Sequence, residues 1–379
     1  MKMIFKMTIL SLTALTVVGK TVYFLGTKKP EQQVILQKND SLKSSVVIKD
    51  TLKTQTHGST DTLKVKEISG CYTYDCAYKQ YVDMLEGRKP IDFKKAVFIY
   101  ENTYLKGTLH YNEFLKYFSD LAKQLKDYIN KKGIAAYKTS GQYAIFSYMY
   151  EPSYLNNNQV FKYDFNDFMG DKNWENMFVT KAMKTKTGNC HSLPYYYKII
   201  ANELNLETFL AIAPNHMYIK HIDENGKWVN IELTNGHPSS DAWMISSMGI
   251  SAEAIKKGIY MDALSEKENV ALCLWDLAMG YQKDNGYDEF VLKCCNTVIK
   301  HYPTCISAIM TKFNCLLIIG KQQQEEAKKK GIGKTPKMKE TYEEVITLDK
   351  QIKELGYREM PQDLYEQWVK SVEQEKQNE

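Results

Sequence analysis

The stretch from Lys184 to His237 constrains the chain most, because it carries three kinds of reactive side chain in a characteristic order. Cys190 follows a short turn, His216 opens a predicted strand, and Glu232 lies on the next strand. A thiol, an imidazole and a carboxylate are the components of a cysteine nucleophile with its base and its orienting acid. We therefore expect Cys190, His216 and Glu232 to form a catalytic triad.

The residues around Cys190 favour an activated thiol. Thr187, Gly188 and Asn189 predict a turn and a helix cap, so Cys190 is expected in the first turn of a helix that runs to about Leu204. Free backbone N–H groups and the positive end of the helix dipole both favour the thiolate. The same N–H groups are candidates for an oxyanion hole. Asn189 is a supporting candidate.

Two predicted strands bring the base and the acid together. Asp223–Gly226 is a strong hairpin turn, and His216 and Glu232 both lie at the end of the hairpin away from it. The exact register stays open, since a shift of one residue changes the face of every side chain. Asn215 and Asn230 are further supporting candidates. The predicted strands span 208–213, 216–222 and 227–233.

A metal site is the competing interpretation of the same stretch. Its candidate ligands would be Cys190, His191, His216, His221 and His237. However, His216 and His221 are an odd number of residues apart on one predicted strand, so their side chains point to opposite faces. Adjacent residues on a helix also diverge. We therefore predict neither a metal nor another cofactor.

The N-terminus has the pattern of an export signal. Two lysines precede an apolar run from Met7 to Gly19. The whole chain of 379 residues has the composition of an ordinary globular protein. Residues 1–26 are expected to be a signal peptide or an N-terminal membrane anchor, and residues 27–66 a polar linker. The protein would then be periplasmic, secreted or anchored facing outside the cytoplasm. Its net charge of +5 is dispersed and no recognition motif accompanies it, so nucleic acid is not an expected partner.

The eight cysteines fit an exported chain, in which disulfides can form. Cys71 and Cys76 are the best local pair. Five further cysteines lie in the last third of the chain, where some can simply be small buried residues of amphipathic helices.

Helical patterns flank the central stretch. Apolar residues at spacings of three and four predict helices within 92–132, whereas 137–171 is aromatic and irregular. Residues 67–262 are expected to form one domain, and 263–379 a second, all-helical one. Helices on either side of Asp284–Gly286 resemble a tetratricopeptide repeat through Leu277, Ala278, Tyr281 and Tyr287, with Phe290 replacing a small residue.

Together these motifs resemble the transglutaminase-like superfamily. The likeness lies in GNC before a helix, PNH opening a strand and WVNIELTNG on the next strand, and it covers roughly residues 81–238. It implies an α+β fold with a papain-like core, in which a nucleophile helix packs on a small antiparallel sheet. The bacterial branch that it resembles most has helices before the core and often tetratricopeptide-like helices after it. The resemblance implies Cys190 as nucleophile, His216 as base and Glu232 as orienting acid, where the superfamily usually has aspartate.

The sequence thus predicts an exported cysteine hydrolase that cleaves an amide bond of a peptide or peptide-like substrate through a thioester at Cys190. Acyl transfer to an amine would use the same residues. The alternative is a non-catalytic interaction scaffold, in which the C-terminal helices bind a protein partner and the central domain is retained as a framework.

Overall fold

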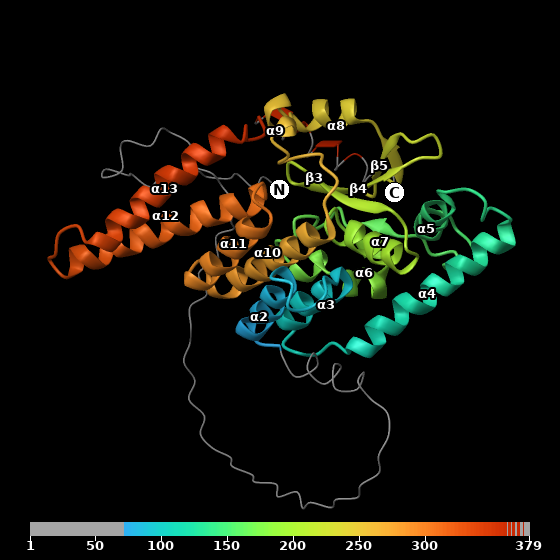
Figure 1. Ribbon diagram of the computed structural model, residues 1–379, viewed down its shortest axis with the longest axis horizontal. Helices are drawn as coiled ribbons and strands as arrows, with labels where there is room; N and C mark the ends of the chain where they lie inside the picture. The colour runs from blue at the N-terminus through green and yellow to red at the C-terminus, as the bar shows by residue number, and fades with distance from the viewer. Residues whose placement is uncertain (1–71, 362, 365, 368–369, 372–373, 375–379) are drawn as a thin grey trace, which may run out of the picture.

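The structure of the protein is a computed structural model that describes residues 72–361, 363–364, 366–367, 370–371 and 374. The expected signal or anchor at 1–26, the linker at 27–66 and Cys71 lie outside these residues. Within them the fold is α+β, as predicted, with a small antiparallel sheet between layers of helices (Figure 1). No helix of the described part has the length and apolar character needed to cross a membrane.

Helices lie on either side of the four-stranded sheet in the described part of the chain. The helices before the sheet are α2 (Tyr74–Leu85), α3 (Phe93–Tyr104), α4 (Tyr111–Lys132), α5 (Ser140–Tyr150), the 3₁₀ helix η1 (Trp174–Met177), α6 (Val179–Thr185) and α7 (Ser192–Glu203). Those after it are α8 (Asp241–Met248), α9 (Ala252–Lys256), α10 (Glu266–Asn285), α11 (Glu289–His301), α12 (Ile306–Lys329) and α13 (Pro336–Glu354). Helix α5 corrects the prediction that 137–171 is irregular, because Ala144, Ile145, Tyr148 and Met149 form a buried helical face.

The sheet is a meander in which each strand pairs with the next in the chain. Its strands are β3 (Thr208–Ala213), β4 (His216–Ile222), β5 (Trp228–Glu232) and β6 (His237–Ser239). Strand β4 pairs with β5 so that Lys220 lies opposite Asn230. Since side chains alternate along a strand, this register places His216 and Glu232 on the same face. The structure therefore fixes the register that the sequence left open.

Helices cover both faces of the sheet. Leu210, Ile219 and Ile231 on one face belong to the same core as α7. Ala211 and Tyr218 on the other face pack with residues of α8, α9 and α12. Figure 1 shows α7 below the sheet and α8 and α9 above it. The sheet is thus held between two apolar layers, and its position relative to α7 is fixed.

The C-terminal helices share the central core. Residues of α10 and α11 pack in one cluster with residues of α2, α3 and α7. The ring of Phe290 contacts those of Tyr281 and Tyr74, at 4.5 and 5.8 Å between ring centroids. These aromatic contacts accommodate the phenylalanine that departs from the repeat pattern. Helices α12 and α13 form a long hairpin that extends to one side (Figure 1).

Helix α10 starts with a capping box, which gives a test of the fold. The Ser265 hydroxyl accepts a hydrogen bond from the Glu268 N–H, and the Glu268 carboxylate accepts one from the Ser265 N–H. We expect Ser265→Ala to lower the free energy of unfolding by about 1 kcal/mol, because the Glu268 N–H loses its side-chain acceptor. Denaturant unfolding measures this difference. Ser246→Ala, at an exposed position in the last turn of α8, should change it by less than about 0.5 kcal/mol; equal effects would contradict the prediction.

Candidate active site

His216 and Glu232 form a buried pair at one end of the sheet. The Nε2 atom of His216 lies 2.5 Å from Oε2 of Glu232, and their side chains are 7% and 4% exposed. The other carboxylate oxygen, Oε1, accepts a hydrogen bond of 2.9 Å from the Thr234 N–H. Both oxygens of Glu232 are therefore held in place, and the imidazole is fixed through one of its two nitrogens.

The pair stabilises the charged forms of both residues. Burial by itself would lower the pKa of His216, but the negative charge of Glu232 and hydrogen bonding with Cys190 and Glu232 raise it to about 10. Burial would likewise raise the pKa of Glu232, but the His216 charge and the Thr234 N–H bring it below its ordinary value. An imidazolium beside a carboxylate is thus the favoured state at neutral pH.

The thiol of Cys190 lies beside this imidazolium. Cys190 is half-buried, and its sulfur is 3.8 Å from the carbonyl oxygen of Asn215, the residue before His216. Burial would raise the pKa of the thiol, but hydrogen bonding with His216, the charge of His216 and hydrogen bonding with Tyr163 together lower it. The structure therefore brings together the three residues that the sequence singled out.

A rigid turn holds the nucleophile. Helix α7 begins at Ser192, so Cys190 stands two residues before the helix and not in its first turn as expected. The fully buried Asn189 side chain accepts hydrogen bonds of 3.0 Å from the N–H groups of His191 and Ser192. It also donates one of 2.9 Å to the Phe168 carbonyl oxygen. Asn189 thus caps the helix one residue before Cys190 and supports the thiol indirectly.

Gly188 is required by close packing at this turn. A Cβ atom at this position would lie 2.6 Å from the Ser192 hydroxyl oxygen and 2.8 Å from a methyl carbon of Leu193. The backbone N–H of Asn189 donates to that same hydroxyl at 3.0 Å. A larger residue at 188 would require the buried side chains of Ser192 and Leu193 to move.

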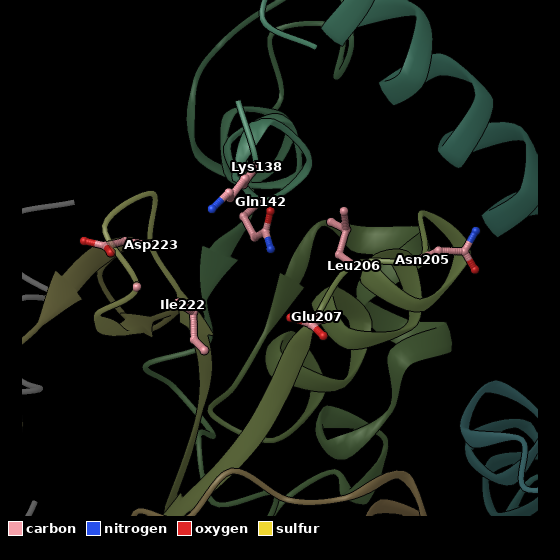
Figure 2. Close-up of a pocket in the computed structure, with 8 residues that line it drawn as sticks. Lys138, Gln142, Asn205, Leu206, Glu207, Ile222 and Asp223 are labelled. Carbon is pink, nitrogen blue, oxygen red and sulfur yellow. The ribbon is translucent and has the colours of Figure 1, made fainter. Parts of the chain in front are cut away.

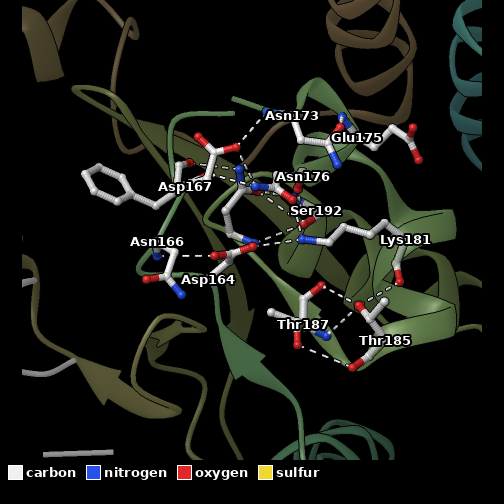
Figure 3. A network of polar contacts seen from close by, with 12 residues as sticks. Asp164, Asn166, Asp167, Asn173, Glu175, Asn176, Lys181, Thr185, Thr187 and Ser192 are labelled. Atoms are coloured by element: carbon white, nitrogen blue, oxygen red, sulfur yellow. Dashed lines mark hydrogen bonds and ion pairs between the residues drawn. The ribbon is translucent and has the colours of Figure 1, made fainter. Parts of the chain in front are cut away.

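A polar network fixes the segment that wraps around the turn (Figure 3). Lys181 forms an ion pair of 2.8 Å with Asp164 and also donates to the Asn176 side chain. Asn176 donates to both the carbonyl and the carboxylate of Asp167 at 2.9 Å, and its own carbonyl accepts from the Ser192 hydroxyl at 3.0 Å. Residues 164–176 are thereby joined to the first residue of α7.

Tyr163 is a residue of the site that the sequence analysis did not single out. It lies on β1 (Lys162–Tyr163), which pairs in parallel with β2 (Thr187–Gly188), so that Tyr163 is opposite Gly188. Its side chain is buried, and its hydroxyl interacts with both the thiol and the backbone N–H of Cys190. The sequence shows only that aromatic residues are frequent here. The strand pairing that brings Tyr163 to the site joins residues that are far apart in the chain.

The two other asparagines that the sequence suggested have different places. Asn215 is exposed and has a left-handed backbone with φ of 53°, and its carbonyl rather than its side chain approaches the thiol. The Asn230 side chain donates to the Ser239 carbonyl and to the Asp241 carboxylate, at 3.2 and 2.6 Å. It therefore joins β5 to β6 and α8, and does not contact His216.

The histidines named for a metal site point to separate partners. His191 contacts Met177 and Asp276, His221 contacts the Ile222 carbonyl, and His237 is exposed. Among the described residues, no three or more histidine, cysteine, aspartate or glutamate side chains are arranged to hold a metal ion.

An open cavity of about 470 Å³ lies at the opposite end of the hairpin (Figure 2). Lys138 and Gln142 line it from the segment before α5 and from α5 itself, and Glu207, just before β3, and Ile222 in β4 line its other side. Ile222 ends β4, whereas His216 begins it. This cavity therefore takes no part in chemistry at Cys190.

Comparison with known proteins gives no match for this chain among protein-family models, curated proteins or solved structures. The function must therefore be argued from the geometry of the site.

The charge state of Cys190 predicts its reactivity. Because its pKa is lowered, the thiolate persists until the pH falls through that lowered value, whereas an ordinary thiol has a pKa of about 8.5. We expect iodoacetamide to alkylate Cys190 at pH 7 at least about fivefold faster than a model thiol, with a shallower rise toward pH 9. Peptide mass spectrometry after timed quenching measures the rate. The buried Cys273 and Cys295 are internal controls; a Cys190 profile equal to that of the model thiol would contradict the assignment.

Proposed function

We propose that the protein is a cysteine hydrolase with a transglutaminase-like, papain-type core that cleaves an amide bond of a peptide or peptide-like substrate. The observation that carries this proposal is the buried pair of His216 and Glu232, 2.5 Å apart, next to a thiol with a lowered pKa. The place of Cys190 before α7, with its base and acid on adjacent antiparallel strands, supports such a core.

The chemistry follows from the arrangement of the three side chains. The Cys190 thiolate attacks the carbonyl carbon of the substrate amide and forms a tetrahedral intermediate. As this collapses, the C–N bond breaks, the amine takes the proton of the His216 imidazolium, and a thioester remains on Cys190. His216 then accepts a proton from water, and the resulting hydroxide attacks the thioester. The carboxylic acid leaves and Cys190 returns to the thiolate, which restores the pair with the His216 imidazolium. Glu232 orients the imidazole and stabilises its charged form.

Tyr163 is the candidate for stabilising the oxyanion. Its hydroxyl lies at the thiol and the N–H of Cys190, which is where the carbonyl oxygen of a bound substrate would need hydrogen-bond donors. When the sulfur loses its charge on acylation, the hydroxyl can turn from the sulfur to the new oxyanion. The Cys190 N–H, released from the tyrosine oxygen, would be the second donor.

The predicted export of the chain defines where this substrate would be found. Residues 1–26 and 27–66 would place the domain at or beyond the cell envelope, so the substrate would be a peptide or protein of that compartment. Transfer of the acyl group to an amine would use the same thioester, and the acceptor that reaches it decides between the two reactions.

Substitution of the acid tests the proposal. We expect Glu232→Gln to lower the rate of peptide-amide hydrolysis by about 10²-fold or more, because the imidazole loses its orienting charge. Cys190→Ala should abolish it. Glu207→Gln, at an exposed acid at the start of the sheet, is the matched control and should leave the rate unchanged. The measurement is cleavage of a mixed peptide library followed by mass spectrometry.

Activity that survives Cys190→Ala would exclude this mechanism. If wild-type protein cleaves no peptide and its Cys190 is no more reactive than a model thiol, the interaction-scaffold alternative takes its place. In that alternative, a protein partner binds the C-terminal helices, and the Cys190→Ala variant keeps full affinity.

Tyr163→Phe tests the oxyanion role. We expect acylation of Cys190 by an activated ester to slow by about 10- to 100-fold, since one donor is lost. Alkylation by iodoacetamide at a pH where the thiol is fully ionised forms no oxyanion and should change by less than about threefold. Tyr197→Phe removes a buried hydroxyl that donates to the Gln142 carbonyl, and it serves as the control. Equal losses in both reactions would show that Tyr163 acts on the position of the thiol and not on the oxyanion.

A further inference from the structure

His191, the residue after the nucleophile, is bound through both ring nitrogens. Nδ1 lies 2.9 Å from the Met177 carbonyl oxygen, and Nε2 lies 2.9 Å from Oδ1 of Asp276. A carbonyl oxygen and a carboxylate oxygen can only accept hydrogen bonds. Both nitrogens of the ring must therefore carry hydrogen, and a ring with two N–H groups is an imidazolium. The structure thus holds His191 as a cation.

Asp276 comes from a distant part of the chain. It lies on α10 and is only 4% exposed. Its second oxygen, Oδ2, accepts a hydrogen bond of 2.8 Å from the Tyr195 hydroxyl, which belongs to α7. A buried carboxylate is stable when a cation and additional donors satisfy it. Asp276 therefore fastens α10 to two residues at the start of α7.

The electrostatic surroundings favour the charged pair. Burial lowers the pKa of His191, but the Asp276 charge, the hydrogen bonds to Asp276 and Met177 and the nearby Cys190 raise it above its ordinary value. The Tyr100 ring stands edge-on, with 6.5 Å between ring centroids, and the Tyr195 ring lies at 4.3 Å. Both tyrosine hydroxyls are neutral at physiological pH, because burial raises their pKa values far above the usual range.

The same histidine is part of the nucleophile turn. Its backbone N–H donates to the Asn189 side-chain oxygen, which also caps α7. Asn189 and His191 both contact Met177, the former through the methionine sulfur at 3.1 Å. Cys190 is thus flanked by two side chains that are anchored to the same residue of η1. Only His191 extends this anchor to the C-terminal helices.

We propose that Asp276 is a positioning residue for Cys190, which holds His191 as a buried imidazolium and so ties the nucleophile turn to helix α10. The C-terminal helical region would then be a working part of the active site and not a separate binding module. This inference rests on the proposed function, because positioning matters only for a reactive thiol.

The test compares Asp276→Asn with the wild-type protein in two measurements. ¹⁵N NMR of ring-labelled histidine, with the His191 signals assigned from a His191→Gln variant, reports the protonation state of the ring. In wild-type protein both nitrogens should show imidazolium shifts at neutral pH. In Asp276→Asn the buried ring should be neutral there, because its counter-charge is gone. Alkylation of Cys190 at pH 7 should then slow by about 5- to 20-fold, as the turn loses its fixed position.

Asp288→Asn is the matched control. Asp288 is also an aspartate of the C-terminal helices that accepts a tyrosine hydroxyl, from Tyr281 at 2.6 Å, but it does not contact α7. Asp288 is the half-buried N-cap of α11, and asparagine caps a helix about as well as aspartate. This variant should therefore leave both measurements within about twofold of wild type. If Asp276→Asn does not fold, alkylation of Cys190 is measured in His191→Gln, which keeps a hydrogen-bond donor but removes the cation. The same loss of rate is expected.

The outcomes separate the two proposals. A neutral His191 ring in wild-type protein at neutral pH overturns the inference. An Asp276→Asn protein in which Cys190 keeps its wild-type alkylation rate also overturns the inference. In both cases, a wild-type Cys190 that reacts faster than a model thiol leaves the proposed function intact. A wild-type Cys190 that reacts no faster than a model thiol overturns the proposed function, and the positioning role is rejected with it.

Discussion

The candidate site depends on the buried ion pair between His216 and Glu232. Removing two charges from water is costly, and an ion pair in the interior is stable only when its geometry is good and its remaining hydrogen-bonding atoms are satisfied. Both conditions hold here, since the second oxygen of Glu232 is bound by the Thr234 N–H and the imidazole faces the Cys190 thiol. A pair with this cost that adds no obvious packing advantage is the kind of feature found at functional sites.

The register of the sheet brings the two residues of this pair to the same end of the hairpin. The hairpin turn at Asp223–Gly226 fixes the register of β4 against β5, and this register puts His216 and Glu232 on one face. The longer arm of glutamate, compared with the aspartate usual in the superfamily that the sequence resembles, still reaches the imidazole at 2.5 Å. The substitution is therefore compatible with the geometry of an orienting acid.

Much of the local structure could be predicted from the sequence, because local rules determine it. The strand at 208–213 follows from a short apolar run, and the strand at 216–222 follows from alternation before a strong turn. The pair α10 and α11 follows from helical periodicity. Local patterns failed where distant contacts decide the outcome. Helix α5 is hidden by an excess of aromatic residues, and the start of α7 is set by the Asn189 cap, which displaces Cys190 from the helix. Tyr163 and Asp276 reach the site only through tertiary structure, across 27 and 86 residues of chain from Cys190 (190 minus 163, and 276 minus 190).

The proposed chemistry requires Cys190 to rest as a thiolate paired with the His216 imidazolium. The most direct measurement is the ultraviolet absorbance of the thiolate as a function of pH, taken as the difference between wild-type protein and a Cys190→Ala variant so that other groups cancel. We expect a titration step below the ordinary thiol pKa of about 8.5, and this step should move upward in a His216→Ala protein. A single step at or above that value, unchanged by the loss of His216, would contradict it.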